Sequence, residues 1–106
     1  MTASSWISEG AGMVYEYALL TIHADRVAEF RSREARAAEI LRSAPGCRSV
    51  EFQQGVDRPA VVLMKIAWER IEDHLEVFPD TPQAAELAAL IGGFFAEEPV
   101  VVHFER

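Results

Sequence analysis

The sequence predicts a single α+β domain of the ferredoxin-like type, with four antiparallel strands and helices on one face of the sheet. Three observations support this fold class. The chain of 106 residues suits one domain. Its apolar residues follow strand and helix periods in the order β-α-β-β-α-β. Two of the predicted strands are apolar on both faces, so both faces of the sheet are expected to be covered.

The first strand is predicted over residues 13–24. It follows an N-terminal extension, residues 1–12, that is rich in Ser, Ala and Gly and is expected to be flexible. Tyr15 and Tyr17 fall on one face of the strand, together with Leu19. The opposite face contains Val14, Ala18, Leu20 and Ile22. Because both sets are apolar, the strand is expected to contact protein on both sides.

A long helix is predicted from Asp25, a suitable N-cap, to about Ser43. The apolar side of this helix contains Val27, Phe30, Ala37, Ala38 and Leu41. The pair Pro45-Gly46 ends the helix, and the alternating segment 47–54 forms the second strand.

The third strand is predicted over residues 60–69, where only Lys65 interrupts an apolar run. A short helix follows from Arg70 to Phe78. The apolar side of this helix consists of Ile71, Leu75 and Phe78. His74 lies among these residues at helical spacing, and we expect it to point toward the sheet.

Thr81 is predicted to cap a last helix that has a proline at its first position and runs to about Ile91. Two glycines end this helix. The final strand is predicted over residues 99–105. Within it, His103 is expected to face either a subunit interface or water.

The uncovered face of the sheet predicts a homodimer. The helices cover one face, whereas strands 13–24 and 60–69 are apolar on both. A large exposed apolar sheet is a liability in a monomer, and two-fold homodimers are the commonest oligomers. We therefore expect the chain to pair with a copy of itself through the sheet face.

The composition excludes several classes of partner. The formal net charge is −7, from 10 basic and 17 acidic residues without a basic stripe, so neither nucleic acid nor a membrane is expected as a partner. No apolar run reaches the roughly 20 residues that span a bilayer. The lone Cys47 allows no internal disulfide, and the reducing cytoplasm is the expected location.

The chain resembles the antibiotic biosynthesis monooxygenase (ABM) family over residues 13–105, and its domain is placed at residues 13–106. The positions that match the family are Trp68, His74, Phe78, Phe94, Phe95, Pro99 and His103. The segment APGCRSVEF is similar to the family's Pro-Gly turn before the second strand. The resemblance implies a dimeric α+β barrel. The best-known members of the family are cofactor-free oxygenases of polycyclic phenols, quinol oxygenases and haem-degrading enzymes.

Cofactor-free oxygenation needs a proton acceptor, a dry pocket and a hydrogen-bond donor near the developing oxyanion. His74 is the predicted acid–base group, because histidine titrates near neutral pH. Trp68 can line the pocket and donate its indole N–H. These two are the candidate catalytic residues. The candidate substrate-binding residues are Tyr15, Tyr17, Phe78 and Phe95. No cofactor is expected, and the three histidines lack the spacing of a metal site.

The leading hypothesis is a cofactor-independent monooxygenase of a small hydrophobic aromatic, phenolic or quinol molecule, with molecular oxygen as second substrate. A non-catalytic dimer that binds an aromatic ligand is the first alternative, because one fold can host several activities. Haem binding or degradation through His74 or His103 is a further alternative. In the family that the chain resembles, the haem-degrading members carry an Asn-Trp-His constellation. This sequence contains no Asn, which weakens the haem alternative.

Overall fold

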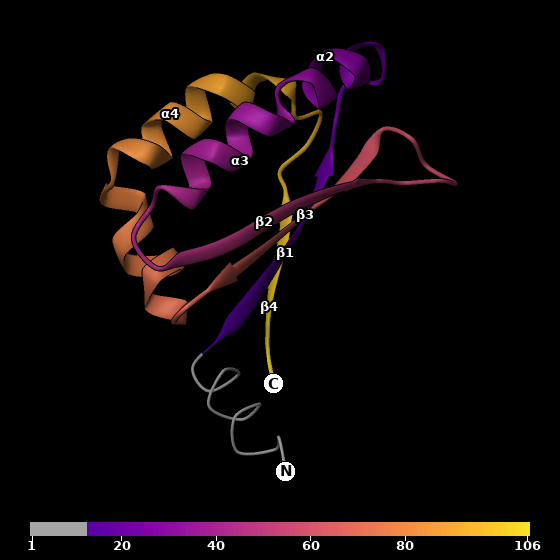
Figure 1. Cartoon of the computed structure of the whole chain (residues 1–106). Helices are drawn as coiled ribbons and strands as arrows, with labels where there is room; N and C mark the ends of the chain where they lie inside the picture. Colours follow the sequence, from indigo (N-terminus) through magenta and orange to yellow (C-terminus); the bar gives the residue numbers. More distant parts are fainter. Residues whose placement is uncertain (1–12) are drawn as a thin grey trace.

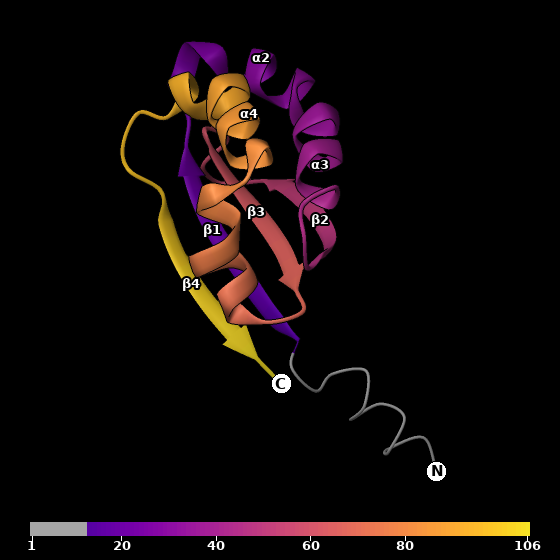
Figure 2. The ribbon, with the colours of Figure 1, turned by 90° about the vertical axis from the view of Figure 1, so that its left-hand side faces the viewer.

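The computed structural model describes residues 13–106, and the predicted N-terminal extension lies outside the described residues. Its strands form one antiparallel sheet in the order β2-β3-β1-β4. The strands are β1 (Val14–Thr21), β2 (Cys47–Gln54), β3 (Val61–Trp68) and β4 (Val100–Glu105). Figure 2 shows β4 and β2 as the two edges of the sheet, with β1 and β3 between them. The predicted ferredoxin-like α+β class is confirmed.

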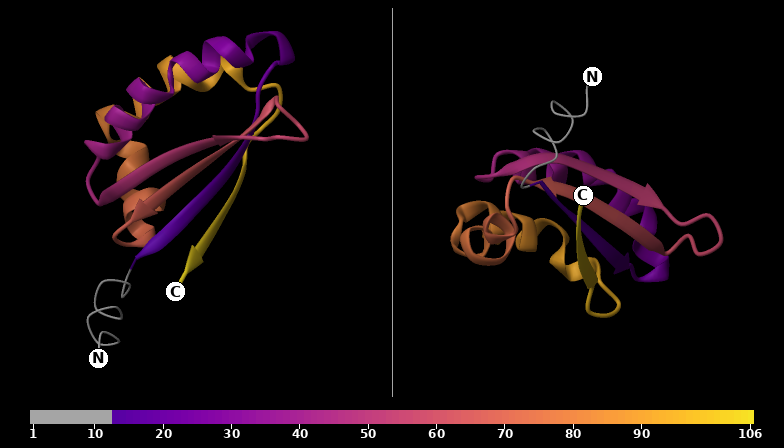
Figure 3. Two further views of the ribbon diagram at one scale, coloured as in Figure 1. Left: turned by 45° about the vertical axis from the view of Figure 1, so that its right-hand side comes forward. Right: turned by 90° about the horizontal axis from the view of Figure 1, so that it is seen from below.

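All the helices of residues 13–106 lie on one face of the sheet (Figures 1 and 3). The helices are α2 (Val27–Ser32), α3 (Glu34–Arg42) and α4 (Pro82–Ile91), with short 3₁₀ turns at Ala24–Arg26, Phe78–Asp80 and Gly92–Phe94 and a π-helical turn at Asp73–Val77. Thr81 caps α4 as predicted, because its hydroxyl accepts a hydrogen bond from the N–H of Ala84 at 3.2 Å. None of these helices is long and apolar enough to cross a lipid bilayer.

The hydrophobic core fills the layer between the helices and the sheet. Its central side chain is Phe30 of α2, which is fully buried. The ring of Phe30 makes edge-to-face contacts with Phe52 of β2 and Phe94, with centroid distances of 6.2 and 5.8 Å. This core holds α2 and the segment after α4 against the same face of the sheet.

The helix predicted to run unbroken from Asp25 to Ser43 is interrupted. A 3₁₀ turn without a side-chain cap forms where Asp25 was expected to cap the helix, so that prediction is wrong. Arg33 separates α2 from α3. Its guanidinium donates to the carbonyl of Leu90 at the end of α4 at 2.7 Å, which ties the break to the neighbouring helix.

The predicted helix around His74 is present, but it has π-helical geometry. The N–H of Phe78 bonds to the carbonyl of Asp73, five residues earlier. This wider turn changes which residues face inward. Leu75 is 54% exposed and Asp73 is only 6% exposed, so the predicted apolar side containing Ile71 and Leu75 is wrong.

Candidate functional site

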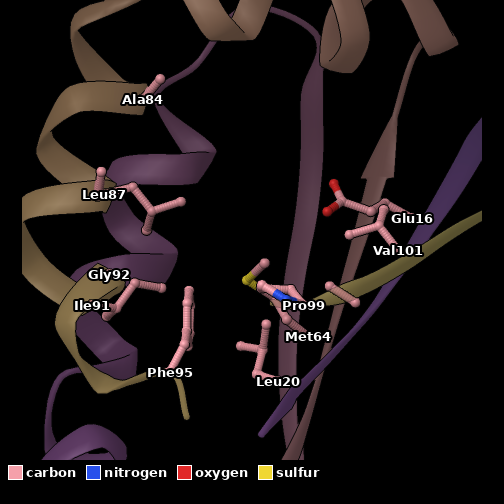
Figure 4. Close-up of a pocket in the computed structure, with 12 residues that line it drawn as sticks. Glu16, Leu20, Met64, Ala84, Leu87, Ile91, Gly92, Phe95, Pro99 and Val101 are labelled. Atoms are coloured by element: carbon pink, nitrogen blue, oxygen red, sulfur yellow. The ribbon is translucent and has the colours of Figure 1, made fainter. Parts of the chain in front are cut away.

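A cavity of about 240 Å³ lies between α4 and the sheet (Figure 4). Its residues come from β1, β3, α4 and the segment that leads into β4. They are Glu16, Ala18, Leu20, Met64, Ala84, Leu87, Ala88, Ile91, Gly92, Phe95, Pro99 and Val101. Every side chain in this set except Glu16 is uncharged and apolar, so the cavity suits a hydrophobic molecule with one polar anchor.

Among residues 13–106, Glu16 is the one ionisable residue of the cavity wall. It sits in the central strand β1 on the helix-facing side and is only 3% exposed. Its Oε1 atom accepts a hydrogen bond from the indole N–H of Trp68 at 2.9 Å. Burial raises the pKa of the Glu16 carboxyl above its ordinary value, and the Trp68 hydrogen bond offsets part of this rise. The site therefore contains a carboxyl group that binds protons more strongly than a surface glutamate.

Trp68 and His74 form a stacked pair behind this carboxyl group. Trp68 is fully buried at the end of β3, diagonal to Glu16 across the β1–β3 pairing. The imidazole ring of His74 lies 5.3 Å from the indole ring with an angle of 9° between the planes. Phe78 contacts the same indole edge-to-face at 5.6 Å. The π-helical turn thus places His74 over the sheet, as the sequence predicted.

The two histidines share a hydrogen bond. His74 Nδ1 lies 2.8 Å from Nε2 of His103 and 3.4 Å from Oε1 of Glu16. Burial, and then the neighbouring His103, lower the pKa of His74 to about 4. His74 is therefore neutral at pH 7. We call Glu16, Trp68, His74 and His103 the buried polar cluster.

The sequence-predicted site residues divide between the two faces of the sheet. His74, Trp68 and Phe78 come together in one place, and Phe95 lines the cavity between α4 and the sheet. Tyr15 and Tyr17 lie on the opposite face, where a shallow pocket includes Lys65 and Phe104. The structure therefore does not bring the two tyrosines to the buried polar cluster.

His103 belongs to the helix-facing side of β4, opposite Glu16 in the register. The expectation that it faces a subunit interface or water is wrong, because its ring packs 5.0 Å from that of His74. Sequence reasoning also missed Glu16. The signal was present, since this acid stands within an otherwise apolar set of alternate residues in a central strand.

The residues of the site do not fit a haem. Neither His74 nor His103 lines the cavity, and its 240 Å³ is smaller than the roughly 300–1,000 Å³ of pockets for drug-sized ligands. In residues 13–106, no group of three or more His, Cys, Asp or Glu side chains is arranged to hold a metal ion.

Known proteins resemble the chain over almost its whole described length. The uncharacterized protein YczJ of Bacillus subtilis (strain 168) is 30% identical over 93 residues, which are 88% of this chain and 98% of YczJ. A Bordetella bronchiseptica structure ascribed to antibiotic biosynthesis monooxygenases has 28% identity and a TM-score of 0.85, covering 90% of this chain and 97% of that one.

A Caulobacter crescentus CB15 structure with the same ascription has a TM-score of 0.76. It covers 96% of this chain and 97% of that one, and at 18% identity it supports the fold alone. Residues 13–90 match the family described as antibiotic biosynthesis monooxygenase. This match covers most of the chain, including β1, β3 and the π-helical turn that carry three of the four residues of the buried polar cluster. The chain therefore belongs to the antibiotic biosynthesis monooxygenase family.

Proposed function

We propose that the protein is a cofactor-independent monooxygenase that oxidises a small hydrophobic phenol or quinol with molecular oxygen. The observation that carries the proposal is the apolar cavity whose wall holds one buried carboxyl group, backed by Trp68 and His74. The cavity of 240 Å³ lies below the roughly 300–1,000 Å³ of pockets for drug-sized ligands, which favours a substrate of one or two rings. Family membership supports the type of reaction.

The proposed reaction draws its electrons from the substrate alone. For 1-naphthol, loss of the phenolic proton gives an electron-rich anion that reduces oxygen. A new C–O bond forms at the para carbon. The O–O bond then breaks, and the second oxygen atom leaves as water with the phenolic hydrogen and the para hydrogen. One 1-naphthol and one O₂ thus give one 1,4-naphthoquinone and one water, and no external reductant is needed.

The residues around the cavity suit the steps of this reaction. The apolar walls, including Phe95, surround the anion and its oxygen adduct with side chains that form no hydrogen bonds. Trp68 holds the Glu16 carboxyl in place through its indole N–H. His74, the acid–base residue expected from the sequence, is neutral at pH 7 and lies 3.4 Å from that carboxyl, so in this proposal it acts on the substrate through Glu16.

Oxygen uptake with 1-naphthol tests the proposal. The purified protein is expected to consume oxygen. His74→Ala is expected to lose turnover by about 100-fold or more, because it removes the imidazole beside the Glu16 carboxyl and proton transfer typically contributes 10²–10⁴ in rate. Binding of 1-naphthol without oxygen uptake by the wild type would instead support the non-catalytic, ligand-binding alternative. Unchanged uptake by His74→Ala would remove this residue from the mechanism.

The proposal includes a homodimer formed through the helix-free face of the sheet. This face carries large apolar side chains that are half exposed, among them Leu19 at 46%, Val102 at 49% and Phe104 at 58%. Burying them against the same face of a second copy removes apolar surface from water. The free thiol of Cys47 suits the cytoplasm, which is the proposed location.

A further inference from the structure

We infer that Glu16 is the catalytic base that accepts the proton of the substrate, with His74 and His103 as positioning residues behind it. This inference rests on the proposed oxygenase function and assigns the proton-transfer step within it. Glu16 lines the cavity, whereas Trp68, His74 and His103 do not. A substrate in the cavity therefore meets the carboxyl group before it meets either imidazole.

The two oxygens of the Glu16 carboxyl group have different surroundings. Oε1 accepts the indole N–H of Trp68 at 2.9 Å and lies 3.4 Å from His74 Nδ1. Oε2 has no hydrogen-bond partner among residues 13–106. Figure 4 shows the carboxyl group extending from β1 toward the α4 side of the cavity. One oxygen is thus fixed by the protein, and the other is available to a phenolic O–H.

This arrangement makes Glu16 both ionisable and basic. The Trp68 N–H stabilises the carboxylate form, which is the form that accepts a proton. Burial raises its pKa, so the carboxylate is a stronger base than a glutamate in water. His103 anchors His74 through their 2.8 Å hydrogen bond, and His74 in turn limits the positions that Oε1 can occupy.

The proton and electrons balance over one turnover. The phenolic O–H bond breaks as the Oε2–H bond forms, and the electron pair of the broken bond stays on the phenolate oxygen. After oxygen has added to the para carbon, Glu16 returns its proton to the outer peroxide oxygen. As the O–O bond breaks, the electron pair of the para C–H bond forms the new C=O bond, and the para hydrogen leaves as a proton that joins the departing hydroxide as water. The carboxylate is then regenerated for the next substrate.

Glu16→Gln removes the base and keeps nearly the same shape, including an oxygen that can accept the Trp68 N–H. Glu16→Asp keeps a carboxylate with a shorter reach. Glu34→Gln is the matched control, because burial also raises the pKa of Glu34. Glu34 lies in α3, outside the cavity, and pairs with Arg31 at 2.9 Å.

The first measurement compares the anaerobic affinities for 1-naphthol and for 1-methoxynaphthalene, which has no O–H to donate. A hydrogen bond to a charged acceptor is expected to favour 1-naphthol by about tenfold in the wild type and in Glu34→Gln. Glu16→Gln is expected to lose this preference. An equal preference in the wild type and Glu16→Gln would overturn the inference, whether or not the protein turns over.

The second measurement is the pH profile of kcat/KM with 1-naphthol. The wild type is expected to show an acidic limb from a carboxyl group, and Glu16→Gln is expected to lose this limb and at least about 100-fold in kcat. Glu16→Asp is expected to restore the limb and part of the rate. Wild-type kcat in Glu16→Gln overturns the assignment of Glu16. The absence of wild-type oxygen uptake, with a Glu16-dependent preference for naphthol, overturns the oxygenase function itself.

Discussion

At Trp68 the requirements of the fold and those of the site coincide. The side chain is fully buried at the end of β3 and belongs to the hydrophobic core. Its N–H is also the hydrogen-bond donor to the buried Glu16 carboxyl, and its ring face packs against His74. A single side chain therefore fills space, satisfies a buried acid and orients an imidazole.

Trp68→Phe tests the polar part of this role, because phenylalanine keeps an aromatic ring and removes the N–H. Glu16 then loses its donor, so its pKa is expected to rise further and the protein to lose about 1–3 kcal/mol of stability from the unsatisfied carboxyl group. Urea unfolding measures the loss. Phe78→Leu, which removes only an aromatic edge contact, is the comparison. A loss from Trp68→Phe no larger than that from Phe78→Leu would contradict this account of the N–H.

The pKa of His74 is lowered and that of Glu16 is raised, so the two residues change the free energy of unfolding in opposite directions as the pH changes. The pKa of His74 falls from 6.5 to about 4 in the folded protein, so between these pH values the unfolded chain binds the proton more readily. The His74 contribution to stability therefore falls as pH falls through this window. Glu16 has a raised pKa, so its contribution falls as pH rises above 4.5.

His74→Gln removes one of these two contributions. The stability of the wild type, relative to His74→Gln, is expected to fall between pH 6.5 and pH 4 by at most about 3 kcal/mol, because the pKa of His74 drops from 6.5 to about 4 and solvent screens part of the effect. Urea unfolding of both proteins at the two pH values measures this difference. A difference between the two proteins that stays constant with pH would show that His74 titrates normally in the folded state.

The π-helical turn is the element that places His74, and the start of β2 supports it. Asp73 is buried in this turn and accepts hydrogen bonds from the backbone N–H and the guanidinium of Arg70. Its side chain packs against Gly46, which has a φ of 80°. A Cβ atom on Gly46 would lie 2.2 Å from Asp73 Oδ2, so only glycine allows this approach.

Gly46→Ala is expected to displace Asp73 and with it the turn that carries His74. The left-handed backbone and the close contact together predict a loss of stability of about 1–3 kcal/mol. Thermal unfolding measures this loss, and loss of turnover with 1-naphthol should accompany it. The matched control is Gly93→Ala, because a Cβ atom there meets nothing within 4 Å. Equal stabilities of the two variants would contradict the packing argument.

At the scale of the whole molecule, the helices of residues 13–106 cover one face of the sheet and leave the other face without a helix. The helices, the cavity and the buried polar cluster occupy the covered face. The other face combines apolar side chains with the pair Tyr15 and Tyr17, and Lys65 Nζ lies 5.7 Å from the ring of Tyr17. A dimer through this face leaves the cavity on the outer side of each sheet, so each subunit keeps its own site.

Val102→Glu tests the proposed dimer, because it introduces a charge into the apolar face of β4. The variant is expected to be a folded monomer, while the wild type sediments as a dimer in analytical ultracentrifugation. Val56→Glu is the control, since Val56 is 95% exposed in the turn between β2 and β3. A dimeric Val102→Glu variant would place the interface elsewhere.

The sequence predicted the sheet well, because strand alternation depends on local residue order. The two strands that were predicted to be apolar on both faces are the central strands β1 and β3. The break at Arg33 was missed because nothing in the neighbouring residues marks it, whereas the hydrogen bond that accompanies it reaches Leu90, 57 residues away. The residues expected to face inward around His74 were chosen by α-helical spacing, which a π-helical turn does not follow.

The site was predicted only in part, for a related reason. Trp68, His74 and Phe95 were identified from their residue types and from the family resemblance, and the first two lie side by side. The pairing of His103 with His74 depends on the register of β4 on β1, which the alternation within a strand does not give. Glu16 was overlooked because it belongs to no sequence motif. An acid in a central apolar strand is nevertheless a signal of a functional residue, because acids are rarely buried.

In the proposed reaction, the cavity beside Glu16 oxidises a small phenol without an added reductant. The most direct test measures oxygen uptake and naphthoquinone formation together, in the wild type and in Glu16→Gln, with 1-naphthol as substrate. We predict one O₂ consumed per 1,4-naphthoquinone formed, no release of hydrogen peroxide, and a rate that depends on Glu16. Binding of 1-naphthol without any oxygen uptake, or uptake that ends in hydrogen peroxide, would contradict the claim.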